Sequence, residues 1–454
     1  MTNLSGAHLN SGAVVGPQGE GRESPSNFSA YPIYKNSGVE WLGLVPEHWA
    51  LGSLKHLAWI RNGRDHKDVE SPDGEYPVIG SGGQFANATR YLYDGESVLL
   101  GRKGTIDKPL YIHGRFWTVD TMFYTEISSG ASAKFLYYNA LTIPFQYYST
   151  STALPSMTQG DLLNHPCAIP TFNEQTQIAR FLDHETARID ALIEEQQRLI
   201  ELLKEKRHAV IFHAVTKGLD PTVPMKDSGV EWLGELPAHW VVSKFGYISS
   251  VVRGGSPRPA GDPELFNGDY SPWVTVAEIT KDDEIYLDET ETFLTKKGSD
   301  QCRVFSKGTL LLSNSGATLG VPKILMIDAN ANDGVVGFEN LSMDKEYSYL
   351  YLATLTEGLR GRAAGSGQPN LNTDIVKSIV VPIPPSNEVA EIVAAVKKLR
   401  AQFNFLSNEA VEGIRLLQER RSALISAAVT GKIDVRGWQS PCSAPSPKLA
   451  KEAV

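Results

Sequence analysis

An internal duplication constrains this chain more than any other feature of its sequence. The heptapeptide SGVEWLG at 37–43 returns unchanged at 228–234. A second block, IPTFNEQTQI at 169–178, returns as IPPSNEVAEI at 383–392. Repetition over such long intervals indicates repeated structural units, and two units are too few for a solenoid. The second block is displaced further than the first, so we expect two related modules of which the second is longer in its centre.

Each copy ends in a segment with the apolar spacing of a long helix. Alternating steps of four and three residues from Ile178 reach apolar residues at seven of eleven positions, and the same steps from Ile392 have the same phase in the second copy. A repeat of 3.5 residues keeps one stripe facing a partner helix, as in a coiled coil. The first set is Ile178, Leu182, Glu185, Ile189, Leu192, Gln196, Leu199, Leu203, Lys206, Val210 and His213.

The ends of these helices are also marked in the sequence. Asn173 and Asn387 are suited to N-caps and Gly218 and Gly431 to C-terminal ends, which gives helices of roughly 40 residues, or about 60 Å. An amphipathic helix commonly packs on its own domain. Here the length and the shared phase favour pairing of the two helices with each other. One helix leads out of the first module and the other ends the second, so antiparallel pairing would hold the two modules at opposite ends of a rod.

The centres of the two copies, 50–168 and 241–382, differ in sequence but share short apolar, β-branched and aromatic runs separated by Gly, Pro, Asn and Asp. This pattern predicts mixed strands with a few helices. The expected fold class is α+β: two related domains separated by two long helices that form an antiparallel coiled coil, with a pseudo-two-fold internal duplication. The tails are rich in small, polar and Pro residues and are expected to be flexible. The expected boundaries are a tail at 1–30, a first domain at 31–168, a first spacer helix at 169–220, a second domain at 221–382, a second spacer helix at 383–435 and a tail at 436–454.

The composition and the motifs narrow the function classes. A formal net charge of −9 argues against a protein that coats nucleic acid by charge alone, although local basic faces or a basic partner are compatible with it. With three cysteines and no run of eighteen apolar residues, we expect a cytoplasmic protein without a disulfide framework or a membrane span. The sequence has no P-loop, GxGxxG, HExxH or GxSxG motif, so we expect no catalysis by this chain. Asp183, His184 and Glu185 are consecutive, so on a helix they point apart and do not form a metal site.

Polar turns at matching places in the two centres hold residue types that read DNA. The segment at 96–112 parallels that at 307–327, and 152–163 parallels 366–376. Arg and Lys can bind guanine edges or phosphates, while Asn and Gln can bind adenine. Because Arg and Lys in glycine-rich turns are more often solvated, the repetition supports the loops as a class more than any one position. The candidate DNA-binding residues are Arg61, Arg64, Arg102, Lys103, Thr105, Ser156, Thr158, Arg253, Arg258, Asn314, Ser315, Thr318, Arg360, Arg362, Gln368 and Asn370.

Four tryptophans belong to the repeated edge: Trp41, Trp49, Trp232 and Trp240. Each could stack on a base. Repetition within a nearly identical segment instead favours a packing or docking role, so we expect these residues to be structural.

From Tyr34 to about Val435 the chain resembles the DNA-specificity subunits of type I restriction-modification systems. The resemblance rests on the combination of SGVEWLGLVPEHW, LLGRKGTIDKP, IPTFNEQTQIARFLDHETARIDALIEEQQRLIELLKEKR and AVTKGLD. It implies two target-recognition domains that bind the two halves of an asymmetric bipartite site in double-stranded DNA, with the helices setting their separation. It also implies two methyltransferase subunits docked on the helices, joined by endonuclease/translocase subunits. AdoMet, ATP and Mg would then belong to those partners, and no cofactor to this chain.

Two other classes stay open. The chain could be a DNA-binding adaptor or a solitary specificity subunit outside an active restriction complex. It could also be a two-headed protein-interaction scaffold, which its acidic charge would suit.

Overall fold

The computed structural model describes residues 28–148, 155–362 and 370–440. The chain divides into two compact units, and each long helix contributes one part to each unit. Unit 1 comprises the chain up to Glu195 together with the chain from Gly413 onward, and unit 2 comprises Gln196–Glu412. Most of the two tails expected to be flexible lies outside the described residues. Their described ends pack, because the rings of Phe28 and Trp438 lie edge-on against Phe181 at 5.1 and 5.4 Å.

The core of unit 1 is a six-stranded mixed sheet in the order β4-β9-β7-β8-β5-β6. Residues along β7 alternate between two apolar clusters, as the two-residue period of a strand requires. Val98 and Leu100 belong to the cluster that contains Phe135 of α1, whereas Leu99 belongs to the cluster that contains Phe116. The elements are β1 (Tyr34–Asn36), β2 (Leu44–Pro46), β3 (Ala50–Ser53), η2 (Leu54–His56), β4 (Ala58–Asn62), β5 (Tyr76–Gly80), β6 (Gly83–Ala88), β7 (Tyr93–Gly101), β8 (Leu110–Thr118), β9 (Met122–Ile127), α1 (Ala133–Ala140), α2 (Phe145–Tyr148), α3 (Gln159–Asn164) and β10 (Pro166–Ile169).

Unit 2 contains a five-stranded sheet in the order β14-β22-β19-β20-β16 and a four-stranded sheet in the order β17-β15-β21-β18. The chain between β14 and β19 is longer than that between the matching strands β4 and β7, and it supplies three of the strands of the four-stranded sheet. The elements are β11 (Met225–Asp227), β12 (Glu235–Pro237), β13 (Val241–Lys244), α5 (Phe245–Ile248), β14 (Ser250–Arg253), β15 (Phe266–Val274), α6 (Val276–Thr280), β16 (Tyr286–Leu287), β17 (Phe293–Leu294), α7 (Lys296–Ser299), β18 (Val304–Phe305), β19 (Leu310–Ser313), β20 (Pro322–Leu325), β21 (Ala329–Ala331), β22 (Val335–Glu339), α8 (Lys345–Thr354), α9 (Thr356–Arg362), α10 (Thr373–Ser378) and β23 (Val380–Ile383).

The repeated edge folds in the same way in both units. The antiparallel pair β1–β2 joins Tyr34 to Pro46, and β11–β12 joins Met225 to Pro237, so the register is the same in both copies. In the same manner β3 pairs with β10 and β13 pairs with β23. The expected fold class, α+β with two related domains and an internal duplication, is confirmed.

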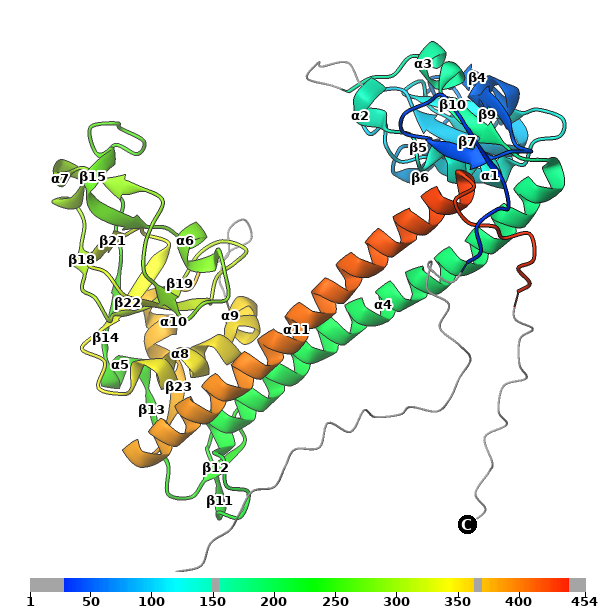
Figure 1. The fold of residues 1–454 in the computed structure, drawn as a ribbon. Helices are drawn as coiled ribbons and strands as arrows, with labels where there is room; N and C mark the ends of the chain where they lie inside the picture. The colour runs from blue at the N-terminus through cyan, green and yellow to red at the C-terminus, as the bar shows by residue number, and fades with distance from the viewer. Residues whose placement is uncertain (1–27, 149–154, 363–369, 441–454) are drawn as a thin grey trace, which may run out of the picture. The chain divides into compact units, whose positions relative to one another are not determined.

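The two long helices, α4 (Phe172–Lys217) and α11 (Ser386–Val429), lie side by side and run in opposite directions within each unit (Figure 1). In unit 1 the Arg421 guanidinium donates to both carboxylate oxygens of Asp190, at 2.8 and 3.3 Å. In unit 2 Arg207 Nη1 donates to Asn404 Oδ1 at 3.0 Å. The two arginines occupy the same position in the two copies of the helix, as do their two partners. The duplication therefore extends to the contact between the helices.

From Leu182 onward, every second residue of the expected apolar stripe is the less exposed one, as predicted. At the positions between them, the less exposed residue is the next one along the chain. Leu192 and Leu199 are 44% and 42% exposed, while the neighbouring Ile193 and Ile200 are less exposed. Thr186, one position after Glu185 of the expected stripe, is buried. Each of these leucines is followed directly by an isoleucine, so the apolar spacing alone does not show which of the two residues faces inward.

The C-terminal ends of the two long helices agree with the prediction from the sequence, whereas their N-terminal ends differ from it. Gly218 and Gly431 follow the two helices with φ of 78° and 72°, as C-terminal glycines do. The helices begin at Phe172 and Ser386, so Asn173 and Asn387 lie inside the first turn and are not the N-caps.

Candidate nucleic-acid interface

In unit 1 the repeated edge is fastened to the start of α4 through one buried carboxylate. Glu174 is 6% exposed and accepts from Trp49 Nε1 at 3.0 Å and from the Tyr31 hydroxyl at 2.7 Å. His48 Nε2 lies 3.0 Å from its other oxygen. Burial and the hydrogen bond to Glu174 raise the pKa of Tyr31 well above its usual range, so Tyr31 stays a donor.

Unit 2 repeats this contact at the start of α11. Trp240 Nε1 donates to Glu388 at 2.9 Å, and His239 Nε2 lies 2.7 Å from the same carboxylate. Like its counterpart in unit 1, Trp240 is fully buried, which confirms the structural role expected of this pair of tryptophans. Trp232 packs against the core of unit 2, whereas Trp41 is 38% exposed.

Unit 1 brings the polar turn after β7 against the segment that precedes α3. Lys103 and Ser156 form an isolated antiparallel bridge, and Met157 N donates to Arg102 O at 3.0 Å. Thr158 then caps α3 by accepting from the third residue of that helix. Two segments that are far apart in the sequence therefore present one polar edge.

Unit 2 builds the same edge from different residues. Ser315 and Asn370 form the matching bridge, and Leu371 N donates to Asn314 O at 2.8 Å. Asn372 caps α10 as Thr158 caps α3. The parallel seen between these loops in the sequence is therefore also a parallel in structure.

A third loop reaches the same edge because a glycine stands at matching positions. A Cβ on Gly63 would lie 2.0 Å from a backbone oxygen of the β8–β9 turn, and one on Gly254 would lie 2.3 Å from a backbone oxygen of the β21–β22 turn. These two turns also accept backbone hydrogen bonds from the polar turns of their own units. Arg64 and Arg253, next to the glycines, thus lie at the same edges as the other candidates.

The unit 1 candidates differ in how exposed their side chains are and in whether those side chains are already paired within the protein. Arg61 on β4 is half-exposed, but its guanidinium lies 3.0 Å from Glu126 on β9. Arg102 donates to a backbone carbonyl at 3.2 Å and is partly buried. Arg64, Lys103 and Thr105 are exposed. These last three are the unit 1 side chains best placed to meet a ligand.

The unit 2 candidates are brought together only in part. Arg253 Nε donates to a carbonyl of the β21–β22 turn at 2.5 Å, and Arg360 on α9 donates to the polar turn at 3.4 Å, beside the exposed Thr318. Arg258 is exposed on a different loop, where its backbone N–H donates to Gln301 at 3.0 Å. The side chain of Arg362 and the whole of Gln368 lie outside the described residues.

Two of the candidate DNA-binding residues use their side chains to hold the protein's own loops and helix ends. Asn314 is 0% exposed, and its Nδ2 donates to Leu371 O at 3.1 Å, which holds the polar turn against the segment before α10. The Thr158 hydroxyl donates to Asp161 at 2.6 Å as part of a capping box. The burial of Asn314 and the hydrogen bonds of both side chains favour positioning of the loops over contact with a ligand.

Sequence reasoning missed the three most exposed aromatic residues among the described residues outside the long helices. Trp59 on β4 is 63% exposed and shares the outward side of its strand with Arg61. Tyr147 and Tyr247 are 85% and 81% exposed. An exposed ring beside a cation, as at Trp59, suits stacking on nucleic-acid bases. The alternation along β4 could have identified Trp59, but the sequence around the two tyrosines carries no such signal.

Metal-ligating side chains do not cluster in the described part of the chain, where no group of three His, Cys, Asp or Glu residues is placed to hold a metal ion. Asp183 and His184 contact different partners, Lys134 at 2.5 Å and Glu185 at 2.9 Å. No helix in the same ranges is both long and apolar enough to cross a membrane.

Comparison with known proteins finds the same family in both halves. The model of the type I restriction modification DNA specificity domain matches residues 46–202 and 237–412. The type I restriction enzyme MjaIX specificity subunit of Methanocaldococcus jannaschii is 31% identical over 35% of this chain and 38% of its own length. The type I restriction enzyme EcoDI specificity subunit of Escherichia coli is 20% identical over 88% of this chain and 91% of its own length.

A solved structure shares the fold. A chain from a study of the assembly and conformational transition of the type I R-M system superposes with a TM-score of 0.65 at 15% identity. The match covers 85% of this chain and 98% of that one.

Proposed function

This chain belongs to the family of type I restriction modification DNA specificity domains, and from that premise we propose that it is the sequence-specificity subunit of a type I restriction-modification complex. The observation that carries the proposal is the repeated three-loop edge, in which the same backbone frame presents different side chains in the two units. Two frames with different side chains are what two unlike half-sites require. A relative matched over 88% of this chain is named a specificity subunit.

Each unit would bind one half of an asymmetric bipartite site in double-stranded DNA. The exposed Lys103 and Thr105 are the proposed contacts of unit 1, and Thr318 with Arg360 those of unit 2. Lys and Arg would bind phosphates or guanine edges, and the threonines would add hydrogen bonds to bases. The two long helices would set the number of unread base pairs between the half-sites.

The long helices would also hold the partner subunits. In unit 2, α4 exposes Leu199 and Leu202, and α11 exposes Phe405 and Leu406, all between 42% and 63%. Apolar side chains exposed in this number on a helix pair support a protein-binding surface. We assign that surface to two methyltransferase subunits, which endonuclease/translocase subunits would join.

We assign no catalytic role and no cofactor to this chain. AdoMet, ATP and Mg would act on the partner subunits, which carry out methylation, translocation and cleavage. A complex that modifies chromosomal DNA would work in the cytoplasm, where we place this protein.

Methylome sequencing tests the proposal. A strain that expresses this chain with its methyltransferase partner should show a split, asymmetric adenine-methylation motif that is missing from a strain without the chain. Lys103→Ala should change or weaken only one half of the motif, and Thr318→Ala only the other. DNA binding without methylation would favour the solitary adaptor, and no salt-sensitive, sequence-dependent DNA binding would favour the scaffold.

A further inference from the structure

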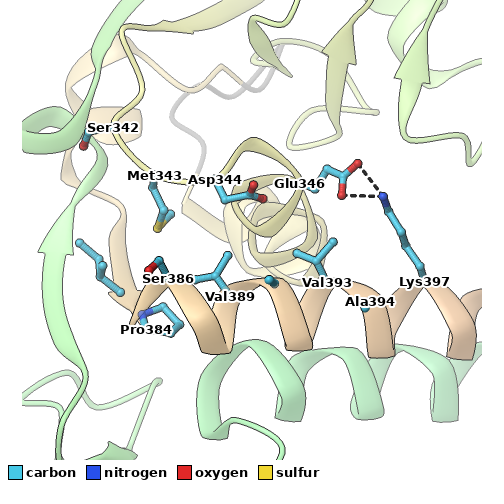
Figure 2. Close-up of a pocket in the computed structure, with 12 residues that line it drawn as sticks. Ser342, Met343, Asp344, Glu346, Pro384, Ser386, Val389, Val393, Ala394 and Lys397 are labelled. Carbon is cyan, nitrogen blue, oxygen red and sulfur yellow. Dashed lines mark hydrogen bonds and ion pairs between the residues drawn. The ribbon is translucent and has the colours of Figure 1, made fainter.

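An ion pair joins each recognition domain to a long helix, and the two pairs have opposite polarity. In unit 1 the domain supplies the cation, because Lys134 on α1 lies 2.5 Å from Asp183 on α4. In unit 2 the domain supplies the anion, because Glu346 on α8 lies 2.6 Å from Lys397 on α11 (Figure 2). Asp183 and Lys397 are separated by the same interval as the starts of the duplicated helical blocks at 169 and 383. They therefore occupy the same position in the two copies.

The two domain residues are equivalent as well. Ser132 caps α1 and Asp344 caps α8, each by accepting the backbone N–H of the third helical residue. Lys134 and Glu346 are each the second residue of the helix that follows. One structural position thus carries opposite charges in the two units, and the helix position facing it carries the complement each time.

The helix that carries Lys134 does not favour a positive charge at this position. A cation in the first turn opposes the helix dipole, which favours an acidic residue such as Glu346 at this position. The Asp183 carboxylate compensates, and the Tyr138 hydroxyl also donates to it at 2.9 Å. In unit 2 the Tyr286 hydroxyl donates to Glu346. Each carboxylate is therefore bound by one ammonium and one phenol, whichever element supplies it.

The unit 2 pair lies at the edge of an apolar contact, because buried side chains of α8 and α11 belong to one cluster. A hollow of about 570 Å³ separates the start of α8 from α11, lined by Met343, Val389 and Val393, and the Glu346–Lys397 pair bridges one end of it (Figure 2). Apolar contact is not directional and favours docking without regard to charge. The charges at its edge are therefore the feature that distinguishes one partner from the other.

We propose that the two pairs form a polarity code that determines which recognition domain docks on which long helix. Exchange of the two domains would bring Lys134 against Lys397 and Glu346 against Asp183, so that two attractions would become two repulsions. Specificity of this kind arises from the penalty on the wrong partner as much as from the gain with the right one. The code concerns assembly of the chain, and it holds whether or not the chain reads DNA.

Charge reversal in the full-length chain tests the code, with amide hydrogen exchange in α1 and α8 as the readout. Lys134→Glu or Asp183→Lys should raise exchange in α1 roughly three- to tenfold, as expected for loss of a half-exposed pair and gain of a repulsion. The double reversal should return exchange to within about twofold of the parent. Glu346→Lys, Lys397→Glu and their double variant should act in the same way on α8.

The Lys134→Glu variant also distinguishes the effect of the ion pair from the effect of charge on the stability of α1 by itself. Glu at this position favours the helix dipole, so a helix that answered only to its own sequence would exchange more slowly. Lys297→Glu is the matched control, because Lys297 on α7 pairs with Glu264 at 2.6 Å in another exposed ion pair and should leave α1 and α8 unchanged. Exchange in β7 and β19 identifies any variant that has lost its fold. The proposal is overturned if the single reversals have no effect on α1 and α8, or if the double reversals exchange as fast as the single ones.

Discussion

Replacing Trp49 with Phe should destabilise unit 1 more than replacing Trp240 with Phe destabilises unit 2. Both indoles are fully buried, and they donate to Glu174 and Glu388 at 3.0 and 2.9 Å. The acceptors differ in their access to water, since Glu174 is 6% exposed and Glu388 is 30% exposed. Water can replace the lost donor at Glu388 far more readily than at Glu174.

The magnitude follows from two contributions. Loss of a hydrogen bond to a buried charged acceptor costs about 1.5–3 kcal/mol, and the smaller ring leaves a cavity that adds ~1 kcal/mol. We expect a loss of ~3 kcal/mol for Trp49→Phe and, with solvent replacing the donor, ~1.5 kcal/mol for Trp240→Phe. Tyr31→Phe keeps the ring and removes another donor to Glu174, so it should cost ~1.5 kcal/mol.

Hydrogen exchange as a function of urea resolves the two units, with amides near the start of α4 reporting on unit 1 and those near the start of α11 on unit 2. Each variant should affect its own unit. The reasoning is refuted if Trp240→Phe costs as much as Trp49→Phe, or if Trp49→Phe costs less than ~1 kcal/mol.

Three further predictions concern the core of unit 1, its loops and the helices. His165 is fully buried, and burial lowers its pKa to about 4. Because the unfolded chain then binds the proton more readily, unit 1 should lose up to about 1.4 kcal/mol per pH unit as the pH falls from about 6.5 towards 4. His165→Asn should flatten this slope in urea titrations, and a parent stability that does not change over this range would contradict the assignment. Gly63→Ala should cost more than ~2 kcal/mol, because its Cβ would lie 2.0 Å from a backbone oxygen, whereas Gly82→Ala, with open space around it, should cost less than ~1 kcal/mol in the same titration. Inserting a matched, heptad-compatible segment into both α4 and α11 should lengthen the unread spacer of the methylation motif, and any change in the half-sites themselves would argue against the division of roles.

Much of the architecture was predictable because it depends on spacing along the chain. The two repeated blocks located the paired modules, and the repeated edge indicated that Trp49 and Trp240 are structural. The matching polar turns were also visible, but only the structure showed that each turn packs against the segment before α3 or α10 of its own unit. The phase of the helical stripe was not predictable, because apolar residues stand at both 192 and 193 and at both 199 and 200.

The candidate DNA-binding residues were likewise predictable only in part. Lys103 and Thr105 are exposed, as their turn suggested. Asn314 has the same kind of sequence context, yet it is buried beneath the segment that begins at Asn370. Arg61 is paired with Glu126, a residue of a strand that arrives 65 positions later. No local pattern encodes either outcome.

The sequence by itself determined the twofold repetition, the two long helices, the mixed strands between them and the places of the polar turns, because each of these follows from residue order and period. Only the tertiary structure decided which side chains of those turns face outward, which phase of the helices is buried, and that Lys134 and Glu346 meet opposite charges on α4 and α11. The physical reason is that burial and ion pairing depend on which distant segments meet. Those meetings result from the packing of all elements together, and a single stretch of sequence does not contain them.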